Sequence, residues 1–125
     1  MGAKYMDIYG RNISIGDYPT IVASPDNYVH LTTWNLEGNE GEISIGKYCL
    51  LTPGVRIASA SKITIGDGCM FANSAYVSDA DWHGIYDRAT PVGKTSPITL
   101  EENVWIGDRA VVGKGVKIGK NSIVA

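Results

Sequence analysis

Phenylalanine, cysteine and long apolar runs are all scarce in this chain of 125 residues, which has one Phe and two Cys. With 15 Gly and few bulky side chains, the interior has to be filled by small aliphatic residues, which suits a narrow core. A chain of this length is in the usual range for one domain. We therefore expect a single domain over 1–125.

Excess positive charge is also lacking, because 11 Lys and Arg face 13 Asp and Glu and leave a net charge of -2. Such a surface has no basic field to attract phosphates, so we expect no nucleic-acid partner. No stretch approaches the roughly eighteen consecutive apolar residues of a membrane-spanning helix. The start MGAKYMDIYG has no apolar signal core, so we expect no membrane attachment and a cytoplasmic location.

Aliphatic residues recur at a fixed period of six, and a compact residue follows each of them four positions later. In the C-terminal part the aliphatic set is Leu100, Ile106, Val112, Ile118 and Val124, and the compact set is Val104, Ala110, Val116 and Ser122. The same register runs through Ile45, Leu51 and Ile57, and again through Ile65, Phe71 and Val77. Both sets should point inward.

A period of six fits neither a helix nor simple alternation, but it fits a short strand followed by a bend, three of which close a coil of about eighteen residues. The sequence therefore predicts an all-β fold, a parallel β-helix shaped as a triangular prism. Glycine often follows the aliphatic residue, as at Gly46, Gly66 and Gly107. We expect these corners to need backbone angles that a β-carbon resists.

The phrase Ile-Ser/Thr-aliphatic marks the start of successive coils at Ile13, Ile43, Ile63 and Ile98. Two of the intervals are much longer than one coil, which predicts long loops at about 22–42 and 78–97. If both loops leave from one corner, two coils apart, the strand spacing of about 4.8 Å puts them roughly 10 Å apart. The two loops could then touch.

The repeat and the segment ITLEENVWIGDRAVVGKGVKIGKNSIVA, which follows a long polar loop, resemble the hexapeptide-repeat acyltransferases. This group includes maltose, galactoside and xenobiotic O-acetyltransferases. The resemblance implies a left-handed β-helix and an acetyl-CoA-dependent O- or N-acetyltransferase that acts on a small-molecule acceptor without a metal. It also implies a homotrimer with each active site between neighbouring prisms.

His83 lies in the polar stretch SDADWHGIYDR, where an imidazole can accept a proton near neutral pH. The matching loop of the family holds the catalytic His, so the resemblance makes His83 the general base that deprotonates the acceptor. The alternative is a structural loop histidine. Asp79, Asp81 and Asp87 are near enough in sequence to orient the ring, or are simply solvated loop carboxylates.

The acceptor cleft is expected from the aromatic and imidazole side chains of the two loops. His30 and Trp34 come from the first loop, and Trp82 and Tyr86 come from the second. A lone histidine such as His30 is also common as a packing residue, and loop aromatics often serve only as anchors.

The resemblance puts coenzyme A beside Trp105 and Gly107 in the VWIG segment, with Lys114 near its phosphates and Ala125 at the end of the donor site. Outward lysines such as Lys114 are also commonly only solubilising. The family continues through further coils after this point. We therefore expect that C-terminal coils are missing and that the natural product is longer.

Three rival interpretations stay open. A degenerate relative would keep the prism but lack a complete coenzyme A site. A γ-class carbonic anhydrase shares the prism but needs three His ligands, and the chain has two His. An ice-binding face needs two outward Thr columns, whereas only Ser14, Ser44, Thr64 and Thr99 form one.

Two further details limit these expectations. The segment 51–54, Leu-Thr-Pro-Gly, occupies the place where sugar-acetylating relatives carry an acceptor-binding Asn, so a sugar acceptor is not implied. Cys49 and Cys69 occupy equivalent inward positions, so they should stack as reduced, packed thiols rather than form a disulfide.

Overall fold

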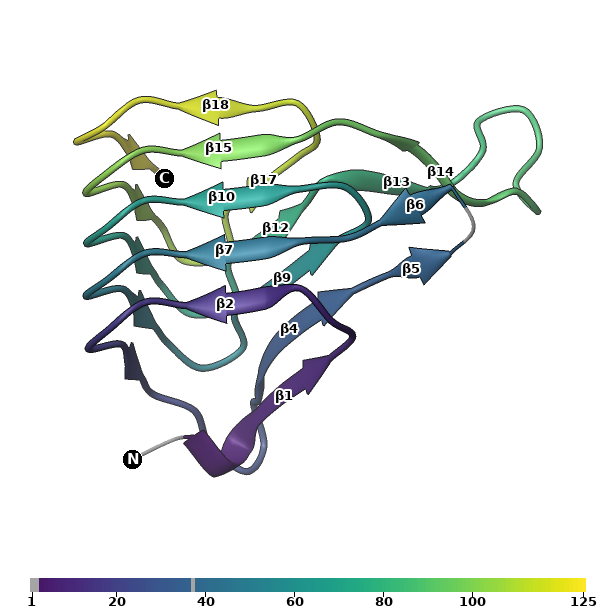
Figure 1. Cartoon of the computed structure of the whole chain (residues 1–125). Helices are drawn as coiled ribbons and strands as arrows, with labels where there is room; N and C mark the ends of the chain where they lie inside the picture. Colours follow the sequence, from purple (N-terminus) through teal and green to yellow (C-terminus); the bar gives the residue numbers. More distant parts are fainter. Residues whose placement is uncertain (1–2, 37) are drawn as a thin grey trace.

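The chain winds around the three faces of a prism, and each face is a five-stranded parallel sheet (Figure 1). The structure, a computed structural model, describes residues 3–36 and 38–125. In Figure 1 the chain runs leftward along the front sheet, returns behind it and climbs, which is the left-handed sense. The predicted all-β fold, a left-handed parallel β-helix, is confirmed.

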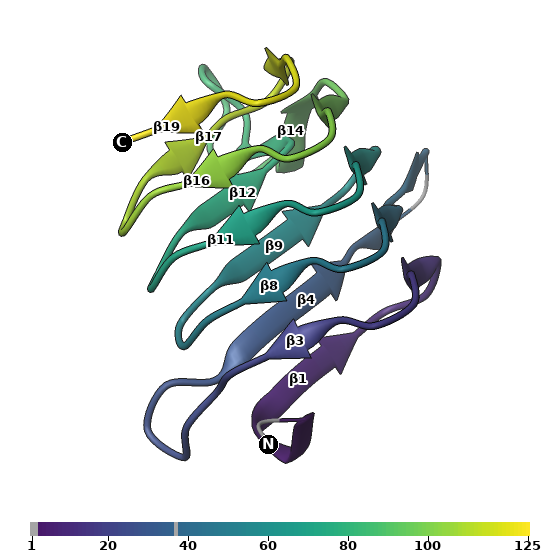
Figure 2. The same cartoon turned by 90° about the vertical axis from the view of Figure 1, so that its left-hand side faces the viewer.

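Each full coil passes through sheet B, then sheet C and then sheet A. Sheet B contains β2 (Ile13–Ile15), β7 (Ile43–Ile45), β10 (Ile63–Ile65), β15 (Ile98–Leu100) and β18 (Lys117–Ile118). Sheet C contains β3 (Thr20–Ile21), β8 (Leu50–Leu51), β11 (Met70–Phe71), β16 (Trp105–Ile106) and β19 (Ile123–Val124). Sheet A contains β1 (Met6–Tyr9), β4 (Val29–Thr33), β9 (Arg56–Ser59), β12 (Tyr76–Ser78) and β17 (Val111–Val112), and the 3-10 turn η1 (Ala3–Tyr5) precedes it. Figure 2 shows sheets A and C stacked coil on coil.

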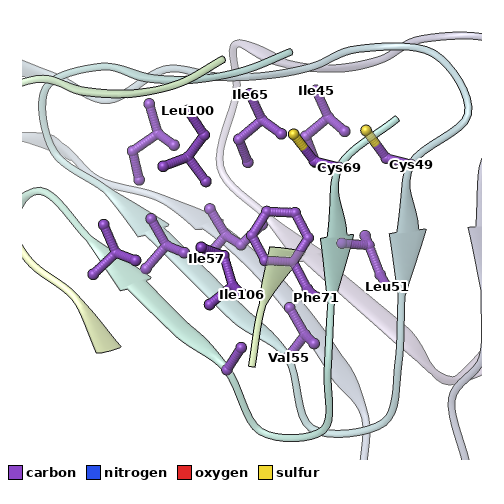
Figure 3. Close-up of a cluster of buried hydrophobic side chains, with 14 of the residues drawn as sticks. Ile45, Cys49, Leu51, Val55, Ile57, Ile65, Cys69, Phe71, Leu100 and Ile106 are labelled. Carbon is purple, nitrogen blue, oxygen red and sulfur yellow. The ribbon is translucent and has the colours of Figure 1, made fainter. Parts of the chain in front are cut away.

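The core is a column of aliphatic side chains that the six-residue repeat directs inward. Ile43, Ile63 and Ile98 are paired in register across sheet B and are fully buried. Phe71, the single Phe of the chain, is fully buried at the centre of the column (Figure 3). Burial of such side chains is the main favourable contribution to folding in a prism this narrow.

Glycines follow the aliphatic positions for a reason that differs from the predicted one. Gly46 and Gly66 do not have the left-handed backbone angles that only glycine adopts easily. Instead, a β-carbon on Gly46 would lie 2.8 Å from the carbonyl carbon of Gly66 in the next coil. Close approach of the coils therefore excludes a side chain. The left-handed angles occur three residues after the inward aliphatic, for example at Tyr48 (φ 58) and Asn103 (φ 57).

The predicted loop at 22–42 is wrong as a single loop. Strand β4 (Val29–Thr33) lies within it and pairs with β1 and β9 in sheet A. Its side chains alternate between buried and half-buried, as in an ordinary coil strand. The extra residues are divided between a bend before β4 and a short hairpin of β5 (Asn35–Leu36) and β6 (Asn39–Glu40) after it.

The predicted loop at 78–97 is mostly a second hairpin, formed by β13 (Ala80–His83) and β14 (Pro91–Thr95). Both hairpins leave the prism at the corner where sheet A passes to sheet B, on the right in Figure 1. They follow β4 and β12, which are two strands apart in sheet A. The prediction of two excursions from one corner, two coils apart, is therefore confirmed.

Cys49 and Cys69 are free, buried and neighbours in the core, as predicted (Figure 3). Hydrogen bonding with Cys69 and the loss of solvation on burial raise the pKa of the Cys49 thiol above its ordinary value. Cys49 therefore stays protonated and acts as a packing residue.

Among the described residues, no helix is both long enough and apolar enough to cross a bilayer.

Candidate active site at the hairpin corner

The two hairpins meet through their tryptophans. The ring centroids of Trp34, which precedes β5, and Trp82, on β13, are 5.6 Å apart and the rings are tilted by 53°. Tilted aromatic pairs of this kind are attractive beyond the area they bury. The expectation that the two excursions touch is therefore confirmed, and the contact fixes both sides of the corner.

The second hairpin is held at its base by the buried carboxylate of Asp79. Its Oδ1 accepts a hydrogen bond from the amide of Ala60 at 2.8 Å. Its Oδ2 accepts from the hydroxyl of Ser59 at 2.7 Å and from the amide of Ser61 at 3.1 Å. The Ser59 hydroxyl also accepts from the amide of Glu42, which follows the first hairpin. One buried network therefore joins the bases of both hairpins.

The backbone of this hairpin is unusual around Trp82 and Val92. The register shifts between Ala80 and Trp82, and Trp82 and Val92, which face each other, have φ values of 72° and 67°. A β-branched residue such as Val92 rarely adopts a positive φ. Trp82 packs on the small cluster of Ala60, Ala80 and Val92, and its indole nitrogen donates to Ser78 at 2.8 Å. Bulges of this kind commonly redirect side chains beside active sites.

His83 ends strand β13 and is exposed. Its Nδ1 lies 3.0 Å from the carbonyl oxygen of Gly84. Because a carbonyl oxygen only accepts hydrogen bonds, Nδ1 carries the proton in the neutral ring and Nε2 has a free lone pair. In this tautomer Nε2 is the ring nitrogen that can accept a proton.

His83 lines a hollow of about 270 Å³. Asp81, Ile85, Tyr86 and Lys94 are among its lining residues. Tyr86 lines this hollow and is fully exposed, whereas none of the other residues predicted to form the acceptor cleft lines it.

The three carboxylates predicted as orienting groups have other partners. Asp79 holds the hairpin base, and Asp81 pairs with Lys114 at 2.8 Å. Asp87 accepts from the amide of Ala89 and the hydroxyl of Thr90 within the hairpin tip. In the part of the chain that the structure describes, the hydrogen-bond partner of the His83 ring is the Gly84 carbonyl. Sequence reasoning missed that partner because a backbone carbonyl leaves no signature in the sequence.

A larger hollow, of about 460 Å³, lies on the outer face of sheet A beside the hairpins. We call it the face hollow; its lining residues are His30, Thr32, Trp34, Arg56, Ile57, Ala58, Tyr76 and Trp82. The structure therefore brings together three of the four residues predicted for the acceptor cleft, and leaves Tyr86 out. Arg56 and Tyr76 were missed, although their outward positions on neighbouring coils are equivalent to that of His30.

Trp105, predicted to contact coenzyme A, projects outward from sheet C and is 45% exposed. It stands in one outer column with Leu50, Met70 and Ile123 on the neighbouring strands. Sheet C is the face opposite the hairpin corner, so Trp105 and His83 of one chain lie on different sides of the prism (Figures 1 and 2).

The other predicted donor residues differ in position. A β-carbon on Gly107 would lie 2.8 Å from the Val124 carbonyl oxygen, and Ala125 is its next neighbour, so close packing of the coils accounts for this glycine. Lys114 reaches the second hairpin through its ion pair with Asp81. Within residues 3–36 and 38–125, no group of three or more His, Cys, Asp or Glu side chains is arranged to hold a metal ion.

Comparison with known proteins agrees with this architecture. The family model of the bacterial transferase hexapeptide, with six repeats, matches residues 97–125. Galactoside O-acetyltransferase of Escherichia coli strain K12 is 32% identical, in a match that covers 66% of this chain and 41% of the relative.

Two further relatives are more distant. The putative lipopolysaccharide biosynthesis O-acetyl transferase WbbJ of Escherichia coli strain K12 is 26% identical, over 56% of this chain and 44% of the relative. The probable acetyltransferase Rv3034c of Mycobacterium tuberculosis is also 26% identical, over 95% of this chain and 41% of the relative. The chain thus spans about two fifths of the length of these relatives.

The six-residue register, the three parallel sheets and these matches agree with one another, and they confirm the resemblance to galactoside O-acetyltransferases. Residues 97–125 match the repeat of the hexapeptide-repeat transferase family, and the chain is a distant homologue of galactoside O-acetyltransferase and related acetyltransferases.

Proposed function

We propose that this protein transfers an acetyl group from acetyl-CoA to a hydroxyl or amino group of a small acceptor, with His83 as the general base. The observation that carries the proposal is the Nδ1 contact with the Gly84 carbonyl, which leaves Nε2 as the proton acceptor. The relatives support the reaction class, because all three are described as acetyltransferases.

The reaction needs only one proton-transfer group. Nε2 of His83 takes the proton of the acceptor hydroxyl or amine as its oxygen or nitrogen attacks the thioester carbonyl. The tetrahedral intermediate then collapses, the carbon–sulfur bond breaks, and the coenzyme A thiolate leaves. The proton on His83 passes to that thiolate, which restores the neutral ring, so no covalent enzyme intermediate is required.

We propose further that a homotrimer completes the site. Sheets A and C are unlike, adjacent faces of a three-sided prism, so contacts of sheet A of one copy with sheet C of the next close into a three-membered ring when each copy is turned by one third of a full rotation. Apolar side chains support this arrangement, since Met70, Trp105 and Ile123 are exposed on sheet C, while Trp34 is exposed beside sheet A. A cleft between the two faces would have the face hollow on one side and Trp105 of the neighbouring copy on the other.

In that arrangement the acceptor occupies the face hollow against Trp82, and the donor lies on the side of the hairpin that carries His83 and Asp81. His83 follows Trp82 directly in the chain, so it stands at the boundary between the two ligands. Lys114, which is held by Asp81, is then close to the donor side.

The proposal is tested by measuring release of the coenzyme A thiol from acetyl-CoA in the presence of a panel of sugars, amino sugars, alcohols and amines. We expect acceptor-dependent release from a particle three times the mass of one chain by light scattering. If coenzyme A does not bind and no acceptor gives release, the protein is instead an inactive β-helix relative. A monomer that is fully active would contradict the shared site.

A further inference from the structure

The face hollow has a charge that sets it apart from the rest of the molecule. The whole chain has a net charge of -2, yet Arg56 lines the hollow and no Asp or Glu is among its described lining residues. His30 also lines the hollow, and its Nδ1 lies 3.5 Å from the carboxylate of Asp7 on β1, which is outside the lining. His30 and Arg56 are paired in register on β4 and β9, so their side chains are neighbours on the outer face of sheet A.

Arg56 is held in place without being neutralised. Its guanidinium carbon lies 4.2 Å from the centroid of the Tyr76 ring on the next coil. This cation–π contact fixes the side chain but satisfies none of its five N–H donors. Arg11, in contrast, pairs with Glu40 at 3.0 Å. Among the ion pairs of residues 3–36 and 38–125, none involves Arg56.

The part of the hollow beside the hairpins is aromatic. Trp34 and Trp82 form a tilted pair across the two hairpins, and both line the hollow. Indole faces bind the flat, apolar side of a ring, whether of a sugar or of an aromatic compound. The hollow therefore combines an aromatic surface for a ring, from Trp34 and Trp82, with the positively charged N–H donors of the Arg56 guanidinium.

From this juxtaposition we infer that the ligand of the face hollow is a ring compound with an anionic group, a carboxylate or a phosphate, which Arg56 binds. The inference rests on the proposed function only in identifying this ligand as the acceptor. A planar guanidinium binds such groups through two parallel hydrogen bonds, which gives both affinity and orientation. With its anionic end on Arg56 and its ring on Trp82, such a ligand spans the hollow from sheet A to the second hairpin, where His83 is the next residue after Trp82.

Calorimetry with matched neutral and anionic probes tests the inference without any acetyl transfer. Phenyl β-D-glucuronide and phenyl β-D-glucoside differ in one carboxylate, and D-glucose 6-phosphate and D-glucose differ in one phosphate. We expect at least one anion to bind about 10-fold more tightly than its neutral partner, the usual effect of one charge-assisted contact. The pair that shows the difference identifies the anionic group.

Variants assign the effect to Arg56. Arg56→Met should weaken binding of the anion about 10-fold and leave the affinity for the neutral partner unchanged. Arg56→Lys keeps the positive charge but loses the planar pair of N–H donors, so this variant should bind the anion with intermediate affinity. Lys117→Met is the matched control, because it removes a positive charge from the outer face of sheet B, and it should change neither affinity.

The outcomes separate this inference from the proposed function. Equal binding of anion and neutral partner, no binding of any probe at millimolar concentration, or an anion preference that survives Arg56→Met would each overturn the inference. Anion binding through Arg56 without acetyl transfer to any acceptor would instead contradict the proposed function. Equal acetylation of charged and neutral acceptors would leave the function standing and exclude Arg56 as its specificity residue.

Discussion

The prism and the hairpin corner are built from different kinds of interaction. In the coils, stability comes from buried aliphatic side chains around Phe71. At the corner, a buried carboxylate, a tryptophan pair and a bulged hairpin replace that regularity. The comparison teaches that the repeat provides the scaffold, while the candidate site lies where the chain departs from the repeat.

The largest effect on stability should come from the centre of the prism. Phe71→Ala removes a fully buried ring from a core that has no other Phe, so we expect a loss of about 3–5 kcal/mol in the free energy of unfolding. Urea unfolding followed by circular dichroism measures it. Phe71→Leu should lose clearly less, and equal losses in the two variants would show that cavity size does not determine the effect.

The next effect should come from the base of the second hairpin. Asp79→Ala leaves the Ser59 hydroxyl and the amides of Ala60 and Ser61 without their acceptor, which should cost about 2–3 kcal/mol. Hydrogen exchange should show faster exchange at Ala60 and Ser61 than at Ile63 in the core of sheet B. A uniform change across the whole chain would contradict a local role for Asp79 in the corner.

The smallest effect should come from the ion pair that ties the last coil to the hairpin. Asp81 and Lys114 are partly exposed, so a double-mutant cycle with Asp81→Asn and Lys114→Met should give a coupling of about 0.2–1 kcal/mol. The coupling should decrease at high salt because mobile ions screen the pair. A coupling that is insensitive to salt would mean that packing, rather than charge, joins the two elements.

The sequence predicted the prism well because one simple rule governs it. A six-residue period forces inward positions such as Ile63 and Phe71, and the coil stack follows from them. Strand β4 (Val29–Thr33) was not predicted because its buried and half-buried residues alternate without the usual hexapeptide spacing.

The candidate site was predicted only in part. The imidazoles and tryptophans stood out as rare residue types, and the structure gathers His30, Trp34 and Trp82 around one hollow. The partner of His83 is a backbone carbonyl, and Arg56 becomes prominent only through its place above Tyr76 on a neighbouring coil. Contacts of this kind depend on the register between coils and on hairpin geometry, which residue types alone do not specify.

The contrast between scaffold and corner is tested most directly by the turnover of the His83→Ala variant with acetyl-CoA and the best acceptor. His30→Ala is the control, since His30 lines the face hollow and its loss should raise mainly the acceptor KM. We predict that turnover by His83→Ala falls by about 100-fold to 10,000-fold, while acetyl-CoA binding and the free energy of unfolding barely change. Near-normal turnover by His83→Ala with any accepted substrate would contradict the assignment of His83 as the general base.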